Sequence, residues 1–168
     1  MKNLFFILVF IASTFAANAQ IGASVQAVNA DDVPAAVISS QASYFPGINV
    51  NVWEKQTVRG QSKSAERYIA NFQNSGQKAR ARYYTNGVGT TATTYFSGSQ
   101  LPTAIQDAAA ANYSDYTLES GEQIIALPKD DVFYRLRLRK GAQKLVVYTD
   151  ESGNEVSGDN LPEVMTKP

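Results

Sequence analysis

The chain has 168 residues, equal numbers of basic and acidic side chains (15 of each), and neither histidine nor cysteine. Its balanced charge argues against nucleic-acid binding, which depends on an excess of basic residues. Without cysteine there are no disulfides, and without cysteine and histidine there are no Ser-His-Asp or Cys-His catalytic sets and no usual zinc ligand sets.

The first 19 residues predict a secretory signal peptide. Lys2 supplies a positive charge, residues 4–15 are almost continuously apolar, and Ala17-Asn18-Ala19 is a small-x-small cleavage motif. The apolar stretch is shorter than the roughly 20 residues that span a bilayer, so we expect cleavage before Gln20 rather than an anchor. No later stretch is long and apolar enough to span a membrane. The mature chain is therefore expected to be periplasmic or secreted.

A flexible leader is expected at residues 20–32, which are small and polar. Val33-Pro34 then opens a helix that ends near Phe45-Pro46-Gly47, because proline suits the first helical turn. Alternating and β-prone segments follow and predict four strands, at residues 48–55, 66–73, 78–85 and 90–96.

The same order recurs in the second half. Leu101-Pro102 opens a helix to about Asn112, and strand-like segments follow at residues 116–127, 132–139 and 143–149. This recurrence predicts an α+β protein of two tandem units, each a helix packed on an antiparallel sheet of three to four strands. We expect the first unit at residues 33–99, the second at 100–158, and a tail at 159–168.

The order of short motifs resembles a known family. It comprises Val33-Pro34, Phe45-Pro46, Trp53, the strand from Glu66 to Phe72, Asn86-Gly87 and Leu101-Pro102. Over residues 33–157 the chain resembles the PepSY-like, beta-lactamase-inhibitor-like periplasmic protein family of Bacteroidetes. The resemblance implies tandem units of a helix on an antiparallel sheet. It implies no established activity, and only fold similarity points toward beta-lactamase inhibition.

Three motifs imitate catalytic or ligand sites. Residues 75–78 match the S-x-x-K motif but lie in turn-forming sequence, without companion motifs. Residues 87–92 match G-x-G-x-x-A but precede a β-prone segment, whereas a dinucleotide site needs a helix there. The acidic pairs, as at Asp150-Glu151, lack calcium-loop spacing and suit turns. We therefore predict no catalytic residue, metal site or cofactor.

Alternation places a mixture of arginine and aromatic residues on the sheet face that the helices leave open. Asn49, Asn51, Trp53 and Lys55 are expected to point away from Ile48, Val50 and Val52. Tryptophan, tyrosine and arginine are enriched at binding hot spots. The predicted partner-binding residues are Trp53, Arg80, Arg82, Tyr84, Arg135, Arg137 and Arg139. A plain solvated face, on which arginine and asparagine keep the sheet soluble, is the alternative.

These features favour an exported, non-catalytic binding module, inhibitor-like in kind, that engages a protein partner in the cell envelope through this face. A small-ligand or envelope-glycan binder that uses Trp53 and the tyrosines is the alternative hypothesis. An enzyme that works through carboxylates is a third, and it would require acids converging in a pocket.

Overall fold

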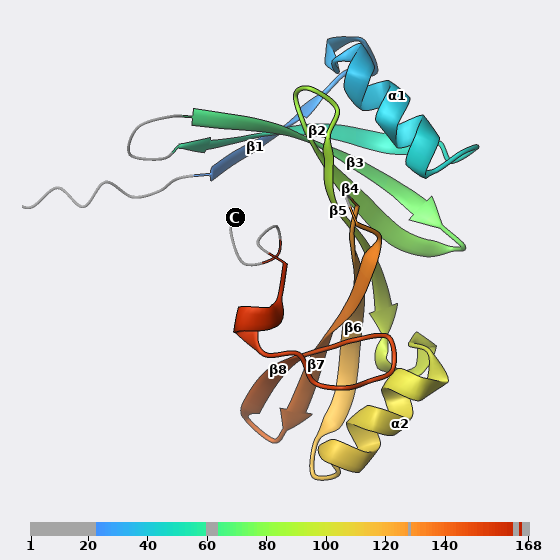
Figure 1. Ribbon diagram of the computed structural model, residues 1–168, viewed down its shortest axis with the longest axis vertical. Helices are drawn as coiled ribbons and strands as arrows, with labels where there is room; N and C mark the ends of the chain where they lie inside the picture. The colour runs from blue at the N-terminus through green and yellow to red at the C-terminus, as the bar shows by residue number, and fades with distance from the viewer. Residues whose placement is uncertain (1–22, 60–63, 128, 163–164, 166–168) are drawn as a thin grey trace, which may run out of the picture.

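The body of the protein is one antiparallel sheet in which every strand pairs with its neighbour in sequence (Figure 1). The structure is a computed structural model that describes residues 23–59, 64–127, 129–162 and 165. Within these residues the strands follow the order β1-β2-β3-β4-β5-β6-β7-β8. Their bounds are β1 (Ala23–Val28), β2 (Val50–Arg59), β3 (Ser64–Asn74), β4 (Gln77–Tyr84), β5 (Gly89–Ser97), β6 (Thr117–Ala126), β7 (Asp131–Lys140) and β8 (Gln143–Thr149).

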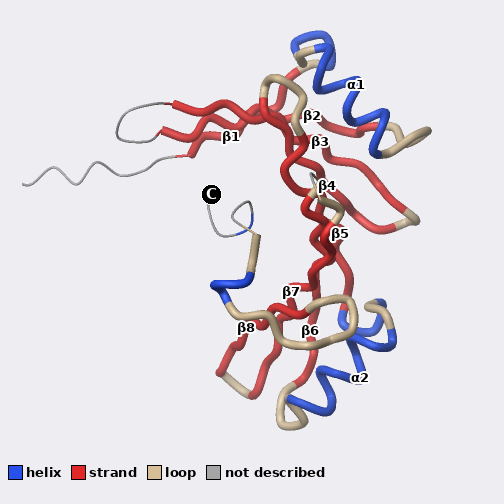
Figure 2. The backbone as a smooth tube through the Cα atoms, viewed as in Figure 1, coloured by secondary structure: helices blue, strands red, loops and turns tan. Residues whose placement is uncertain are grey.

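Two α-helices interrupt the succession of strands. α1 (Ala35–Tyr44) joins β1 to β2, and α2 (Thr103–Asn112) joins β5 to β6. Pro34 and Pro102 stand immediately before the helices, so both predicted helices are confirmed to within a residue. The sheet is strongly curved, with α1 and α2 both on its outer side (Figure 2). Short 3-10 turns lie at Ala30–Asp32 (η1), Gly98–Gln100 (η2) and Gly158–Asn160 (η3).

The predicted fold class is wrong. Two separate helix-on-sheet units would require the sheet to break near residue 99. Instead β5 pairs with β6 from Thr91↔Ala126 to Ser97↔Ser120, and this pairing joins all eight strands. The reason is physical, since two short sheets would each leave an unpaired inner edge. α2 returns the chain antiparallel to β5, so the edges pair, and the fold is one mostly β open sheet that carries two helices.

The structure describes most of the expected leader and none of the predicted signal peptide. Residues 23–28 of the expected leader form β1, which pairs with β2 from Ala23↔Val58 to Val28↔Trp53. The predicted signal peptide at residues 1–19 lies outside the described residues. In the part of the chain that is described, no helix has the length and hydropathy to span a bilayer.

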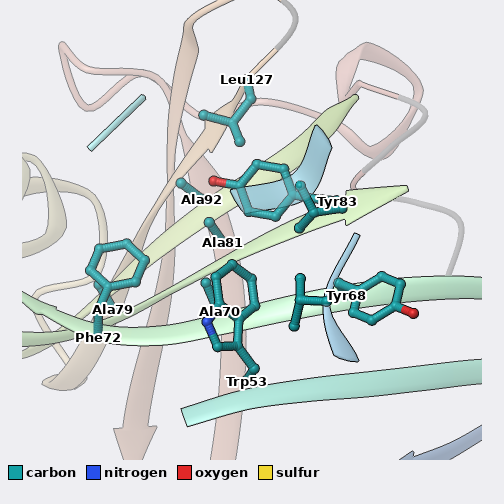
Figure 3. Packing of buried hydrophobic residues seen from close by; sticks show 11 residues of the cluster. Trp53, Tyr68, Ala70, Phe72, Ala79, Ala81, Tyr83, Ala92 and Leu127 are labelled. Carbon is teal, nitrogen blue, oxygen red and sulfur yellow. The ribbon is translucent and has the colours of Figure 1, made fainter. Parts of the chain in front are cut away.

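Two apolar clusters lie between the sheet and its helices. Beneath α1, Val37 of the helix forms one buried cluster with Trp53, Tyr68 and Tyr83 of the sheet. Figure 3 shows these rings together with the small residues of β4. Beneath α2, Ile105 packs with Leu136 and other apolar side chains of β7 and β8. Both helices therefore cover one face of the sheet and leave the other face without helical cover.

Candidate partner-binding face

We define the open face as the side of the sheet opposite α1 and α2. Strand pairing assigns residues to it, because directly paired residues point to the same side. Ala81 is buried beneath α1 and pairs with Ala70 and Ala92, so these three residues point toward the helix. The residues directly before and after each of them along the strand therefore point to the open face. The open face carries Arg67, Arg80, Arg82, Tyr84, Tyr95, Glu122, Arg135, Arg137, Arg139 and Tyr148.

The structure brings six of the seven predicted site residues to this face. On β4, the buried Ala79, Ala81 and Tyr83 alternate with the less buried Arg80, Arg82 and Tyr84. On β7, the buried Tyr134, Leu136 and Leu138 alternate in the same way with Arg135, Arg137 and Arg139. The predicted alternation of both strands is confirmed, because the register shifts beside β4 and β7 place their extra residues, Thr90 and Glu119, in the partner strands β5 and β6.

Trp53 is the exception, and a β-bulge explains it. Val50 pairs with Phe72 but Val52 pairs with Asn71, so Asn51 is an extra residue in β2. An inserted residue reverses the alternation beyond it. Trp53 is consequently 7% exposed and packed beneath α1, whereas Val52 is 45% exposed. The predicted facing of Val52 and Trp53 is wrong, and the structure separates Trp53 from the six other site residues.

A buried carboxylate neutralises part of the arginine surface. Glu122 of β6 has a side chain only 7% exposed and accepts hydrogen bonds on both oxygens. Arg135 Nη2 lies 2.5 Å from its Oε2, and Arg137 Nη2 lies 2.9 Å from its Oε1. Burial disfavours the charge on Arg135, but the hydrogen bond and negative charge of Glu122, together with the nearby Tyr148 hydroxyl, outweigh burial and raise the pKa of Arg135. These two arginines therefore belong to a charge network within the sheet.

Tyrosine rings support two other arginines. The Arg67 guanidinium carbon lies 5.5 Å from the ring centre of Tyr84, and that of Arg80 lies 5.5 Å from the ring centre of Tyr95. Such cation–π contacts contribute about 0.5–1 kcal/mol each at exposed sites. They hold the planar guanidinium groups over the sheet, and the buried Nε atoms of both arginines have no hydrogen-bond partner among the described residues.

Arg82 occupies the middle of the face. Its Nη1 donates a 3.3 Å hydrogen bond to Thr91 Oγ1. Burial lowers the pKa of Arg82, and the nearby positive charge of Arg80 lowers it further. Ile69 and Thr91 pair with Arg82 in register and are buried although no helix covers them. The long arginine and tyrosine side chains therefore shield the centre of the open face from water.

Arg139 lies near the end of β7 and is 46% exposed. Its Nη1 contacts Glu119 Oε1 at 3.0 Å, and its Nε donates to the Gly141 carbonyl. Exposed pairs of this kind stabilise a fold by about 0–1 kcal/mol. Arg139 is thus already paired and stands apart from the arginines of β3 and β4.

Sequence reasoning missed the roles of Tyr95, Glu122 and Tyr148. Tyr95 pairs with Glu122, Glu122 with Arg135, and Arg135 with Tyr148, so the four side chains form one row across β5 to β8. Alternation along each strand could assign them a side. Only the register between strands, which joins distant parts of the sequence, brings them together.

The motifs that imitate ligand sites have structural roles. Ser75 lies in the turn between β3 and β4 with φ 49°, and Gly87 lies in the turn before β5. The Asp150 carboxylate accepts hydrogen bonds from the backbone N–H groups of Ser152 and Asn154. The side chain and backbone of Asn154 lower the pKa of Asp150. Within the described residues, no group of three acidic side chains is arranged to hold a metal ion.

Comparison with known proteins gives a likeness of fold. No family model matches this sequence, and no curated protein matches it either. A BLIP-like protein from Bacteroides fragilis aligns with a TM-score of 0.58 at 15% identity, over 74% of this chain and 84% of that one. A DUF2874 family protein from Bacteroides ovatus aligns with a TM-score of 0.57 at 16% identity, over 74% of this chain and 85% of that one.

A third solved structure is similar as well. A protein from Bacteroides eggerthii, provisionally described as periplasmic, aligns with a TM-score of 0.55 at 16% identity, over 74% of this chain and 86% of that one. These neighbours support the beta-lactamase-inhibitor-like part of the sequence resemblance and give no support to the PepSY-like part. At such identities the likeness concerns the fold, and function must be argued from the open face.

Proposed function

We propose that this chain is an exported, non-catalytic binding module that engages a protein partner in the cell envelope through the open face. The observation that carries the proposal is the composition of that face: arginine and tyrosine side chains on five strands, on the side of the sheet that α1 and α2 do not cover. These residue types are enriched at binding hot spots. Periplasmic residence is supported by the signal-like sequence at residues 1–19 and by the provisional description of a structural neighbour.

The glycan-binding alternative depends mainly on Trp53, and this residue is buried. Stacking on a sugar requires an accessible aromatic ring, and the Trp53 ring is packed among Tyr68, Ala70 and other core residues (Figure 3). An inhibitor role against a specific enzyme would be one form of the proposed partner binding. The spread of arginines over β3, β4 and β7 favours a protein surface over a small enclosed ligand.

Serine substitution of Arg135, Arg137 and Arg139 is a poor test of this proposal. The change would leave Glu122 buried without its two cationic partners, and an unpaired buried charge destabilises a fold by several kcal/mol, about 3–5. Lost capture would then report unfolding rather than a lost interface. A suitable test leaves the internal charge network intact.

Photo-crosslinking supplies such a test, because the chain has no cysteine of its own. Single cysteines at Gln73 and Val146 would place a benzophenone label at two exposed positions of the open face. A cysteine at Ile38, exposed on α1, is the matched control. After incubation with envelope extract, we expect the same discrete protein adduct from both open-face positions and none from Ile38. An adduct formed only from Ile38 would contradict the proposal.

A further inference from the structure

Pairs of arginines two residues apart occur on both β4 and β7 of the open face. On β7, Arg135 and Arg137 bind opposite oxygens of the single carboxylate of Glu122. On β4, Arg80 and Arg82 have the same spacing and point to the same side of the sheet. The β7 pair therefore shows what this spacing can hold: one carboxylate bridged between two guanidinium groups.

The β4 pair lacks the carboxylate that the β7 pair has. Glu122 stands directly across from Arg135, whereas Thr93 stands across from Arg80 and Thr91 across from Arg82. Among the described residues, no acidic side chain lies within 4.0 Å of Arg80 or Arg82. The same holds for Arg67, which is diagonal to Arg82 across β3 and β4.

The local electrostatics favour an incoming anion. Burial lowers the pKa of Arg82 most, and the positive charges of Arg80 and Arg67 lower it further, although Tyr95 and the negative charge of Glu122 oppose this shift. Partial burial of these arginines also weakens the solvation of their charges. A carboxylate placed among them would offset both the mutual repulsion and the lost hydration. The rings of Tyr84 and Tyr95 hold Arg67 and Arg80 in position, which reduces the side-chain entropy lost on binding.

We propose that Arg67, Arg80 and Arg82 form a carboxylate-binding site for an acidic segment of the partner protein. One carboxylate bridges Arg80 and Arg82 as Glu122 bridges Arg135 and Arg137, and a second acidic side chain reaches Arg67. The inference rests on the proposed function and specifies that the bound part of the partner carries acidic side chains. Arginine suits this role because its planar fork of donors matches the two oxygens of a carboxylate.

The test uses the mature chain, labelled with ¹⁵N, and the N-acetylated, C-amidated hexaglutamate peptide as the probe. The Nε–Hε signals of the arginines report which guanidinium groups the peptide contacts. We expect shifts for Arg67, Arg80 and Arg82 that exceed those of Arg139, and none with hexaglutamine. The variant Arg80→Gln/Arg82→Gln should bind at least about tenfold more weakly, because charge-assisted hydrogen bonds are lost. Lys129→Gln/Lys144→Gln removes the same charge at exposed positions and should change affinity less than about twofold.

Each other outcome overturns the site. Equal weakening in both double variants would show that net charge alone attracts the peptide. Shifts confined to Arg137 and Arg139 would place binding elsewhere, and a response to inorganic phosphate but not to hexaglutamate would indicate a phosphorylated ligand. Because the wild-type shifts are measured directly, a misfolded variant does not decide the result. Crosslinking from Gln73 and Val146 without hexaglutamate binding would retain the proposed function and refute the carboxylate site.

Discussion

The Tyr83 hydroxyl of β4 donates a 2.7 Å hydrogen bond to Gln41 Oε1 of α1, and both side chains are buried. It is a polar contact beside an apolar cluster, and it fixes α1 over β4. Loss of one partner in such a pair leaves the other unsatisfied, at a cost of about 1–3 kcal/mol. We expect Tyr83→Phe to lower the free energy of unfolding by that amount in urea denaturation. Tyr84→Phe, at an exposed tyrosine, should change it by less than about 0.5 kcal/mol.

The raised pKa of Tyr83 predicts that the folded protein becomes less stable at alkaline pH. Burial raises the pKa of Tyr83 above its usual value of 10.0. The unfolded chain therefore releases this proton at a lower pH than the folded chain, and stability falls as pH rises above about 10. One such group contributes a slope of up to about 1.4 kcal/mol per pH unit. Tyr113, whose pKa is raised to about 12 by its hydrogen bond to Glu155, adds to the slope. Tyr83→Phe should reduce the slope, and an unchanged slope would contradict this account.

Glu122 should matter more to stability than the other paired acids. Glu122→Gln would leave Arg135 and Arg137 without their shared carboxylate, and we expect a loss of about 1.5–3 kcal/mol, as for lost hydrogen bonds between charged groups. Glu119→Gln removes the exposed partner of Arg139 and should cost less than about 1 kcal/mol. Denaturation of the two variants in parallel is the measurement. Equal losses of unfolding free energy in the two variants would show that Glu122 stabilises the fold no more than an exposed paired acid does.

Trp53 is the single tryptophan, so its fluorescence reports one environment. Because it is 7% exposed in the cluster beneath α1, we expect blue-shifted emission and little quenching by iodide. Trp53→Ala should cost about 3–5 kcal/mol through the cavity it leaves. Trp53→Phe should leave crosslinking from Gln73 and Val146 unchanged, because the ring lies on the helix-covered side. Water-like emission would contradict the packing described for β2.

Gly87 allows α1 and the turn before β5 to pack closely together. A Cβ there would lie 2.6 Å from the Ala36 carbonyl oxygen, and its φ is +86°. Gly76 has a similar φ of +78° with nothing within 4 Å of the added Cβ, so it isolates the cost of the backbone conformation. We expect Gly87→Ala to cost about 1–3 kcal/mol more than Gly76→Ala, as overpacking does. Equal thermal unfolding midpoints in the two variants would argue against the close contact.

Local features of the sequence determined both helices, most of the strands and much of the candidate face, but not β1, which was expected to be a flexible leader. Pro34 and Pro102 mark the two helices, and alternation correctly set the sides of Arg80 and Arg82 on β4 and of Arg135 on β7. These assignments succeed because side-chain direction in an unbroken strand depends only on position along that strand. The repeated order of elements, however, suggested two separate sheets, and nothing local in the chain states whether two strands pair.

Tertiary structure alone decided the single sheet, the side of Trp53 and the partner of Arg135. Pairing of β5 with β6 joins the sheet, the bulge at Asn51 turns Trp53 into the core, and the register of β6 against β7 places Glu122 beside Arg135. Each of these depends on registers between segments that only the folded chain brings together. A shift of one residue reverses every later side chain, so the sequence determined which residues alternate, and the packing of the strands decided which of them meet.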